Sequence, residues 1–256
     1  ITWSSASNWA LAAIPIFIMM GELIFRTDIS DRLFRGLSPI VRRIPGGLIH
    51  TNIMGCTLFA AVSGSSTATT ATVGRITVTE LKARGYDTNL SIGSLAGAGS
   101  LGLLIPPSIV LIVYGILAET SVRDLFIAGV IPGLMIAALY STYIGARCYL
   151  NPALTPTEAG APTAAELGRA LIDLMPVLSL ILIVIGSIYS GIATPSEAAA
   201  VGLTATLAMI VVMGQFTWSM FIEALLSSVV TSAMVCSIVV SAALLSTTMG
   251  YLHVPQ

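Results

Sequence analysis

The chain has 256 residues, of which 55% are hydrophobic and 9% are charged, and its formal net charge is −1. Soluble domains carry about 25% charged residues, so this composition excludes an ordinary soluble protein and predicts an integral membrane protein. The near-neutral charge gives no sign of a nucleic-acid partner. The cysteines Cys56, Cys148 and Cys236 are far apart, as expected for core residues rather than a disulfide framework or a metal cluster. Because the chain begins at Ile1 without a signal peptide and stops at Gln256 after an apolar run, we expect a fragment of a longer protein.

The first predicted spanning helix covers Asn8–Phe25, because a bilayer crossing needs about 20 mostly apolar residues. Trp9 is expected to anchor it at the interface. Glu22 is either an end residue that reaches the interface or an intramembrane functional acid, and its position near the helix end favours the first alternative. Five arginines alternate with apolar residues in Arg26–Arg43. This pattern predicts an amphipathic helix on the membrane surface, broken at Pro39.

A stretch of small and hydroxylated residues without charge, Ser63–Thr72, separates two apolar arms, Leu48–Val62 and Val73–Arg84. Irregular polar backbone at bilayer depth is tolerated only where protein or a water-filled cavity surrounds it. We therefore predict a re-entrant hairpin with this stretch as its tip. Two full crossings are the alternative, but the second arm is too polar for a lipid-facing span. Its polar residues include Arg75, Thr77, Thr79, Glu80 and Lys82.

The next apolar segment, Ser91–Leu117, is predicted to be a discontinuous helix. Three glycines in Gly97–Gly102 loosen the backbone, and Pro106-Pro107 cannot donate to a helix ladder. The two prolines suit the first turn of a new half-helix, with Ser108 near its exposed N–H groups. A simple proline kink is the alternative, although one proline is enough for a kink.

The remainder of the chain predicts four further spanning helices. They are Leu125–Tyr149, Leu174–Tyr189, Ala198–Met213 and Ala224–Met249. Asn151–Thr163 carries three prolines and several small polar residues and is predicted to be a loop. Thr194 is expected to cap the following helix, with Pro195 in its first position and Glu197 closing a capping box, although Glu197 could instead carry a proton. Basic residues collect in cytoplasmic loops. If the first helix runs inward, the arginine-rich segment lies inside, and Arg123 alone lies outside. The other basic residues placed inside are Lys82, Arg84, Arg147 and Arg169.

Neither interruption contains Asp, Glu, His, Lys or Cys, over residues 63–73 and 93–113. Carbonyl and hydroxyl oxygens suit a hard cation such as Na⁺, whereas a proton relay needs a titratable group. Secondary transporters place half-helix N-termini at an anionic substrate group and unwound carbonyls at a coupling cation. The sequence therefore predicts a Na⁺-coupled secondary transporter.

A series of motifs occurs in order over nearly the whole chain: Trp9-Ala-Leu-Ala-Ala-Ile-Pro-Ile-Phe-Ile, Gly21-Glu-Leu, Phe59-Ala-Ala-Val-Ser-Gly-Ser-Ser, Gly85-Tyr-Asp, Leu101-Gly-Leu-Leu-Ile-Pro-Pro-Ser, Leu125-Phe-Ile-Ala-Gly and Gly191-Ile-Ala-Thr-Pro-Ser-Glu-Ala-Ala-Ala-Val. As a set they resemble the large membrane (M) subunit of a tripartite ATP-independent periplasmic (TRAP) transporter. The resemblance implies an all-α polytopic bundle of the elevator type, built from inverted repeats. It also implies a bacterial or archaeal inner membrane, a small four-helix membrane subunit, a periplasmic substrate-binding protein and an organic acid of the sialic acid or C4-dicarboxylate class.

On this basis residues 1–45 form the first span and the surface arm. Residues 46–120 form the transport unit, with the hairpin at 48–85 and the broken helix at 91–118. Residues 121–256 form spanning helices and the start of a second repeat. The family's first helix and second hairpin are not in this chain.

The resemblance implies that the hairpin tip and the glycine-rich break line the sodium and substrate region. We therefore expect the Na⁺ ligands among Ser63, Gly64, Ser65, Gly99 and Gly102. We expect the substrate contacts among Ser65, Ser66, Thr67, Ser100, Pro107 and Ser108.

Two other classes of function compete with transport. An intramembrane serine protease could use a serine of the tip, but a nucleophilic serine needs a base within reach. The histidines are His50, at the far end of the hairpin arm, and His253, so no enzyme is expected. A membrane scaffold would use the hydroxyls only for helix packing, and it would show no Na⁺ dependence.

Overall fold

The computed structural model describes residues 9–156 and 162–251, and every regular element in these residues is a helix. Four of the described helices are long and apolar enough to cross a membrane: α8 (Val122–Leu150), α9 (Ala164–Tyr189), α10 (Pro195–Val212) and α11 (Trp218–Tyr251). They confirm the four predicted later spans. The chain is therefore a multi-pass helical membrane protein.

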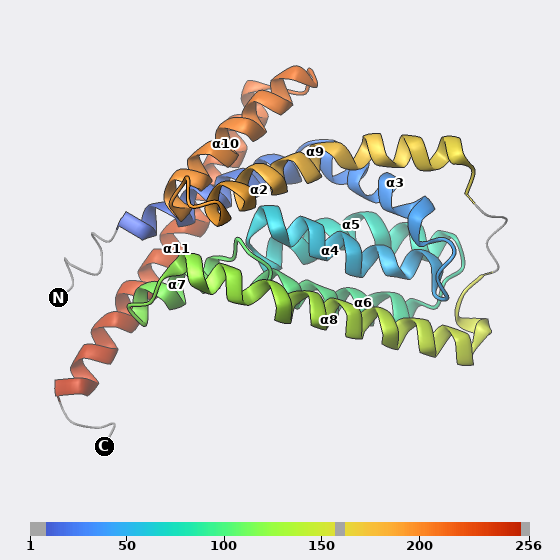
Figure 1. Cartoon of the computed structure of the whole chain (residues 1–256), viewed down its shortest axis with the longest axis horizontal. Helices are drawn as coiled ribbons and strands as arrows, with labels where there is room; N and C mark the ends of the chain where they lie inside the picture. The colour runs from blue at the N-terminus through green and yellow to red at the C-terminus, as the bar shows by residue number, and fades with distance from the viewer. Residues whose placement is uncertain (1–8, 157–161, 252–256) are drawn as a thin grey trace.

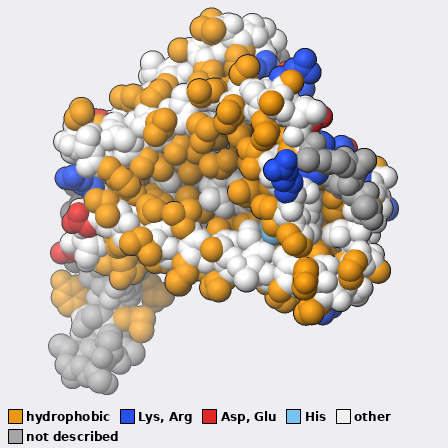
Figure 2. Space-filling model, turned by 45° about the vertical axis from the view of Figure 1, so that its right-hand side comes forward, with side chains coloured by type: hydrophobic (Ala, Val, Ile, Leu, Met, Phe, Trp, Pro, Cys, Tyr) orange, Lys and Arg blue, Asp and Glu red, His pale blue; other side chains and the backbone are white. Residues whose placement is uncertain are grey.

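α8 and α9 run along opposite sides of the molecule, and the hairpin helices lie between them (Figure 1). α10 and α11 cross the bundle beside α2 (Ala13–Phe25) and pack on it (Figure 1). Apolar side chains cover much of the surface that Figure 2 shows. Ile131 on α8, Leu182 on α9 and Val230 on α11 are 76%, 72% and 70% exposed. Apolar surface of this extent matches a lipid environment better than water.

α2 follows a short 3₁₀ turn, η1 (Trp9–Ala12), and it is too short for the predicted first span. Its 13 residues cover about 20 Å at 1.5 Å per residue, against a hydrocarbon core of about 30 Å. Phe17, Met20 and Leu23 are fully buried against neighbouring helices. Within the described residues α2 is thus a core helix; Asn8 and the side chain of Trp9 lie outside them.

The arginine-rich segment forms α3 (Ile29–Val41), which continues through Pro39, so the predicted break is wrong. Pro39 lies near the C-terminal end, where it removes one ladder hydrogen bond, and α3 packs along α9, which compensates for that loss. The amphipathic pattern is confirmed, because Leu33 and Leu37 are buried and Arg35 is exposed. The buried face of α3 packs against protein. The sequence pattern alone could not distinguish this packing from contact with a membrane surface.

The predicted hairpin consists of α4 (His50–Ser63), after a 3₁₀ turn at η2 (Gly47–Ile49), and α5 (Ser66–Ala83). The two helices lie side by side (Figure 1). α4 has 14 residues and spans about 21 Å, which is short for a complete crossing. This length favours the re-entrant arrangement.

The irregular tip is much shorter than Ser63–Thr72, because only two residues separate α4 from α5. Gly64 has a left-handed conformation (φ +63°), and Ser65 is extended and caps α5. The hydroxyls farther along are compatible with helix because they donate to carbonyls four residues earlier. Thr70 Oγ1 donates to Ser66 O at 2.8 Å, and Thr72 Oγ1 donates to Ala68 O at 2.7 Å.

The predicted interruption of the next helix is confirmed. α6 (Thr88–Gly99) passes into a 3₁₀ turn, η3 (Ser100–Leu103), and α7 (Ile109–Leu117) begins after an irregular stretch. Pro106-Pro107 precede α7 and are not in its first turn, so that detail was wrong. A proline disfavours the α conformation in the residue before it, so the helix cannot continue through this stretch, and Ser108 is extended where it precedes α7.

The later elements follow their capping residues. Thr163 caps α9 with Glu166 in a capping box, so this helix begins at Ala164 rather than at Leu174. The predicted cap of α10 by Thr194 and Glu197 is confirmed. The predicted loop at Asn151–Thr163 holds a 3₁₀ turn, η4 (Pro152–Leu154). Its residues 157–161 lie outside the described part.

Candidate functional site

The hairpin tip and the helix interruption meet through main-chain atoms. The Ile109 N–H donates to Gly64 O at 3.1 Å. A Cβ at Gly64 would lie 2.8 Å from Pro107 O, and a Cβ at Gly102 would lie 2.7 Å from Ser66 Cα. The two interruptions are therefore in direct contact, and glycine is required where they approach each other.

Four helix ends converge on this joint. α4 ends at Ser63 and α6 ends at Gly99, while α5 begins at Ser66 and α7 begins at Ile109. Helix C-termini carry partial negative charge on free carbonyls, and N-termini carry partial positive charge on free N–H groups. The joint thus offers oxygen ligands for a cation and N–H dipoles for an anion within one region.

Hydroxyl groups of the tip form a small network. Ser63 Oγ and Thr69 Oγ1 are 3.0 Å apart, and both residues are buried. Ser65 Oγ lies 3.0 Å from Thr67 Oγ1 and accepts from the Ala68 N–H at 3.3 Å. Each hydroxyl oxygen keeps a lone pair that could face a cation.

The predicted site residues Ser100 and Ser108 stabilise the joint through hydrogen bonds to main-chain carbonyls. The Ser100 hydroxyl donates to Gly97 O at 2.7 Å, and the Ser108 hydroxyl donates to Leu103 O at 2.8 Å. Gly99 packs against the Thr70 side chain. These contacts stabilise the break and occupy the hydroxyl protons of both serines.

A cavity of about 260 Å³ lies beside the tip. Its walls come from the hairpin, from α2 and from α11. The lining residues with polar side chains are Ser63, Ser65, Thr67, Glu22 and Thr231. The structure thus brings three of the predicted site residues to one cavity, and it adds two that the sequence prediction did not include.

Glu22 is the more consequential addition. The sequence favoured an end residue reaching the interface, but the Glu22 side chain is only 19% exposed and pairs with Arg26 at 3.4 Å. The prediction that the site holds no titratable group is therefore wrong for the cavity as a whole. An acid inside an apolar helix was the available sequence signal. Thr231 gave no such signal, because its place depends on how α11 packs.

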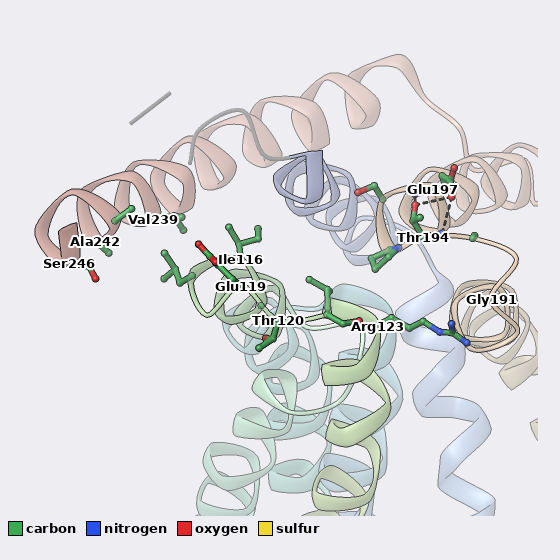
Figure 3. Close-up of a pocket in the computed structure, with 18 of the residues that line it drawn as sticks. Ile116, Glu119, Thr120, Arg123, Gly191, Thr194, Glu197, Val239, Ala242 and Ser246 are labelled. Atoms are coloured by element: carbon green, nitrogen blue, oxygen red, sulfur yellow. Dashed lines mark hydrogen bonds between the residues drawn. The ribbon is translucent and has the colours of Figure 1, made fainter. Parts of the chain in front are cut away.

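A larger cavity, of about 1230 Å³, lies elsewhere, between the α7–α8 turn, the α9–α10 turn and α11 (Figure 3). Arg123 donates to Tyr189 O there at 3.1 Å. Glu197 accepts from both the N–H and the hydroxyl of Thr194 at 2.8 Å, which Figure 3 marks. These bonds favour the capping role of Glu197 over proton transfer. None of the predicted cation or substrate residues lines this cavity.

His50 starts α4, whereas the tip serines follow its other end. Its ring Nε2 lies 2.8 Å from Pro45 O, so the ring faces away from the tip. The hypothesis of a serine protease therefore has no histidine base near the tip among the described residues; His253 lies outside them. Within the same residues, no group of three or more His, Cys, Asp or Glu side chains is placed to hold a metal.

Sequence comparisons agree with these features. The family described as "Tripartite ATP-independent periplasmic transporter, DctM component" matches residues 2–256. Over 201 residues the chain is 41% identical to the C4-dicarboxylate TRAP transporter large permease protein DctM of Pseudomonas aeruginosa, which covers 78% of this chain and 46% of that protein. It is 37% identical over 191 residues to the ectoine TRAP transporter large permease protein TeaC of Halomonas elongata (75% and 44% covered). It is 33% identical over 253 residues to the sialic acid TRAP transporter large permease protein SiaM of Vibrio cholerae (97% and 58% covered). The chain spans roughly half the length of these relatives.

Proposed function

Because this chain belongs to the DctM component family of the tripartite ATP-independent periplasmic transporters, we propose that it forms half of the solute pathway of a Na⁺-coupled importer of organic acids. The host membrane is the inner membrane of a bacterium or archaeon. Family membership makes the chain part of a transporter rather than an enzyme.

The observation that carries this proposal is the joint between the hairpin tip and the helix interruption. The carbonyl ends of α4 and α6 meet the start of α5 and its hydroxyls at this joint, and such neutral oxygens suit a hard monovalent cation. The N-termini of α5 and α7 begin at the same joint and favour a carboxylate. A cation and an acid that share one site are coupled through their mutual attraction.

The driving force for uptake is a Na⁺ gradient together with the membrane potential. Each charge that moves inward gains about 2.3 kcal/mol per 100 mV, so two or more Na⁺ ions per acid would support uptake against a gradient. We propose that the hairpin and the broken helix, which are joined at the tip, move together against α2 and α11, as an elevator, because the tip cavity lies between the hairpin on one side and α2 and α11 on the other.

The relatives' names include C4-dicarboxylate, ectoine and sialic acid as solutes. For this chain we propose an organic acid of the sialic acid or C4-dicarboxylate class. We also propose a periplasmic binding protein that delivers the acid and a small four-helix membrane subunit.

The test is uptake by the full-length protein with both partners in proteoliposomes. Labelled sialic acid and a labelled C4-dicarboxylate are supplied with the binding protein, with and without an inward Na⁺ gradient. We expect one acid to accumulate only with Na⁺. Ser65→Ala, which removes a cavity hydroxyl, should raise the Na⁺ requirement, whereas Thr79→Ala, on the exposed face of α5, should not.

Accumulation that proceeds equally without Na⁺ would contradict the coupling. Equal behaviour of the two variants would contradict the assignment of the tip as the ion site. A protein with no uptake of any organic acid and no thermal response to Na⁺ would favour the scaffold hypothesis.

A further inference from the structure

Glu22 is an acidic side chain on the wall of the tip cavity. It comes from α2, while Ser63, Ser65 and Thr67 come from the tip of the hairpin. Its side chain is 19% exposed, although a lone carboxylate in an apolar region is costly. The position is thus held by specific contacts.

Those contacts form a chain of ion pairs between α2 and α11, which we term the Arg26 clasp. Arg26 lies 3.4 Å from the Glu22 carboxylate and donates through Nη1 to Glu223 Oε2 at 2.7 Å. Nearby, Asp28 and Gln215 exchange two hydrogen bonds of 3.0 Å each. The clasp fixes α11 against the end of α2, and it limits the freedom of the Glu22 carboxylate.

The clasp contains two carboxylates and one guanidinium, so its formal charge is negative. A further arginine, Arg75 of α5, stacks on Phe25, another residue of the cavity wall, at 5.1 Å from the ring centroid. Among the described residues Arg75 forms no ion pair with either carboxylate. Of the two acids of the clasp, only Glu22 lines the cavity.

We propose that Glu22 sets the cation affinity of the tip cavity, as a charged wall that faces the neutral oxygens of the hairpin, and that Arg26 is its positioning residue. A single carboxylate beside hydroxyl oxygens favours a monovalent cation over a neutral or anionic occupant. Because Glu22 belongs to α2 and the hydroxyls belong to the hairpin, a bound cation would also link the two groups of helices. This inference rests on the proposed Na⁺ coupling and adds a residue that the hairpin chemistry did not require.

The experiment compares two carboxylates that contact the same arginine. Purified full-length wild type, Glu22→Gln and Glu223→Gln are heated at increasing NaCl concentration, with choline chloride holding the ionic strength constant. A cation that binds only the folded state raises the unfolding temperature. We expect Glu22→Gln to raise the Na⁺ concentration for half the stabilisation about tenfold, since the negative charge on the cavity wall is lost. Glu223→Gln, which removes a carboxylate that does not line the cavity, should change this concentration much less than Glu22→Gln does.

The outcomes separate the two claims. A wild type that does not respond to Na⁺ overturns the proposed coupling and this inference with it. A wild type that responds, with Glu22→Gln unchanged, overturns this inference alone. Equal shifts in Glu22→Gln and Glu223→Gln also overturn it, because they would show a purely structural role of the clasp. If Glu22→Gln is too unstable to purify, Glu22→Asp decides: withdrawing the carboxylate by one methylene should raise the half-effect concentration several-fold, and no shift overturns the inference.

Discussion

At the scale of single residues, the tip depends on glycines for two different physical reasons. Gly64 occupies a left-handed conformation, φ +63°, in which a side chain is strained. At Gly102 the limit is space alone, because a Cβ there would lie 2.9 Å from the main-chain nitrogen of Ser66. Neither position leaves room for a side chain, so the joint between hairpin and broken helix is made of backbone.

Gly64→Ala should lower the stability of the protein by about 1–2 kcal/mol from backbone strain, with a further loss from displacement of Pro107. Gly93→Ala in α6 is the matched control, because a Cβ there meets nothing within 4 Å, and it should stabilise the helix by about 0.5–1 kcal/mol. Thermal unfolding in detergent measures both changes. Equal unfolding temperatures for the two variants would contradict the strained turn.

The local sequence was sufficient to place both interruptions, because glycine and proline act on the backbone wherever they occur. It did not give the length of the tip. Thr70 and Thr72 suggested irregular backbone, yet their hydroxyls bond to helix carbonyls of α5. Glu22 was visible as an acid in an apolar segment, but its role depends on Arg26 and Glu223, which the chain brings together only after α11 packs on α2.

At the scale of helices, the contact between α3 and α9 determines how closely the arginine-rich segment approaches α9. A Cβ at Gly36 would lie 2.7 Å from Leu174 Cγ and 2.8 Å from Ala170 O. The carbonyl belongs to the α9 main chain and cannot turn away as a side chain could. Gly36 therefore sets the closest approach of the two helices.

Gly36→Ala should force α3 away from α9 and lower the unfolding free energy by about 1–3 kcal/mol. Gly168→Ala, one turn from the start of α9, adds a Cβ in open space and should be neutral or slightly stabilising. Unfolding temperatures of the two purified variants provide the measurement. A Gly36→Ala protein as stable as the Gly168→Ala protein would show that the crossing adjusts freely.

Helix existence was more predictable than helix extent. α8, α10 and α11 follow from long apolar runs, whereas α9 begins earlier because Thr163 and Glu166 form a cap that outweighs the polar composition of its first turns. α2 was predicted as a span because composition cannot separate a lipid-facing helix from one surrounded by protein. Pro39 was predicted to break α3 because the hydrogen bond that a proline removes can be read from the sequence. The packing of α3 on α9, which compensates for that loss, is a tertiary contact that the local sequence does not give.

At the scale of the whole molecule, the distribution of basic residues predicts its orientation. Lys82 lies in the last turn of α5 and Arg84 follows it, Arg147 lies in the last turn of α8, and Arg123 lies in the first turn of α8. Both ends of the hairpin lie near the C-terminal end of α8, as a re-entrant arrangement requires: a Cβ at Gly46 would lie 2.8 Å from Ile144, and the Asp87 N–H donates to Leu154 O at 3.0 Å. Because cytoplasmic segments collect basic residues, we expect the hairpin to enter from the cytoplasm.

Single cysteines at Lys82 and Thr120, two exposed positions, test this orientation in a Cys236→Ser background. A membrane-impermeant maleimide added to intact cells should label Thr120→Cys, while Lys82→Cys should react only after permeabilisation. Labelling of both from outside would contradict the predicted topology.

The hydrogen bond from Ile109 N to Gly64 O has a consequence for how such a chain can change. Since donor and acceptor are peptide groups, exchange of the surrounding side chains leaves this bond intact. On the proposed function, the side chains that line the tip cavity could therefore be exchanged for a different solute preference while the main-chain link between the hairpin and the broken helix persists.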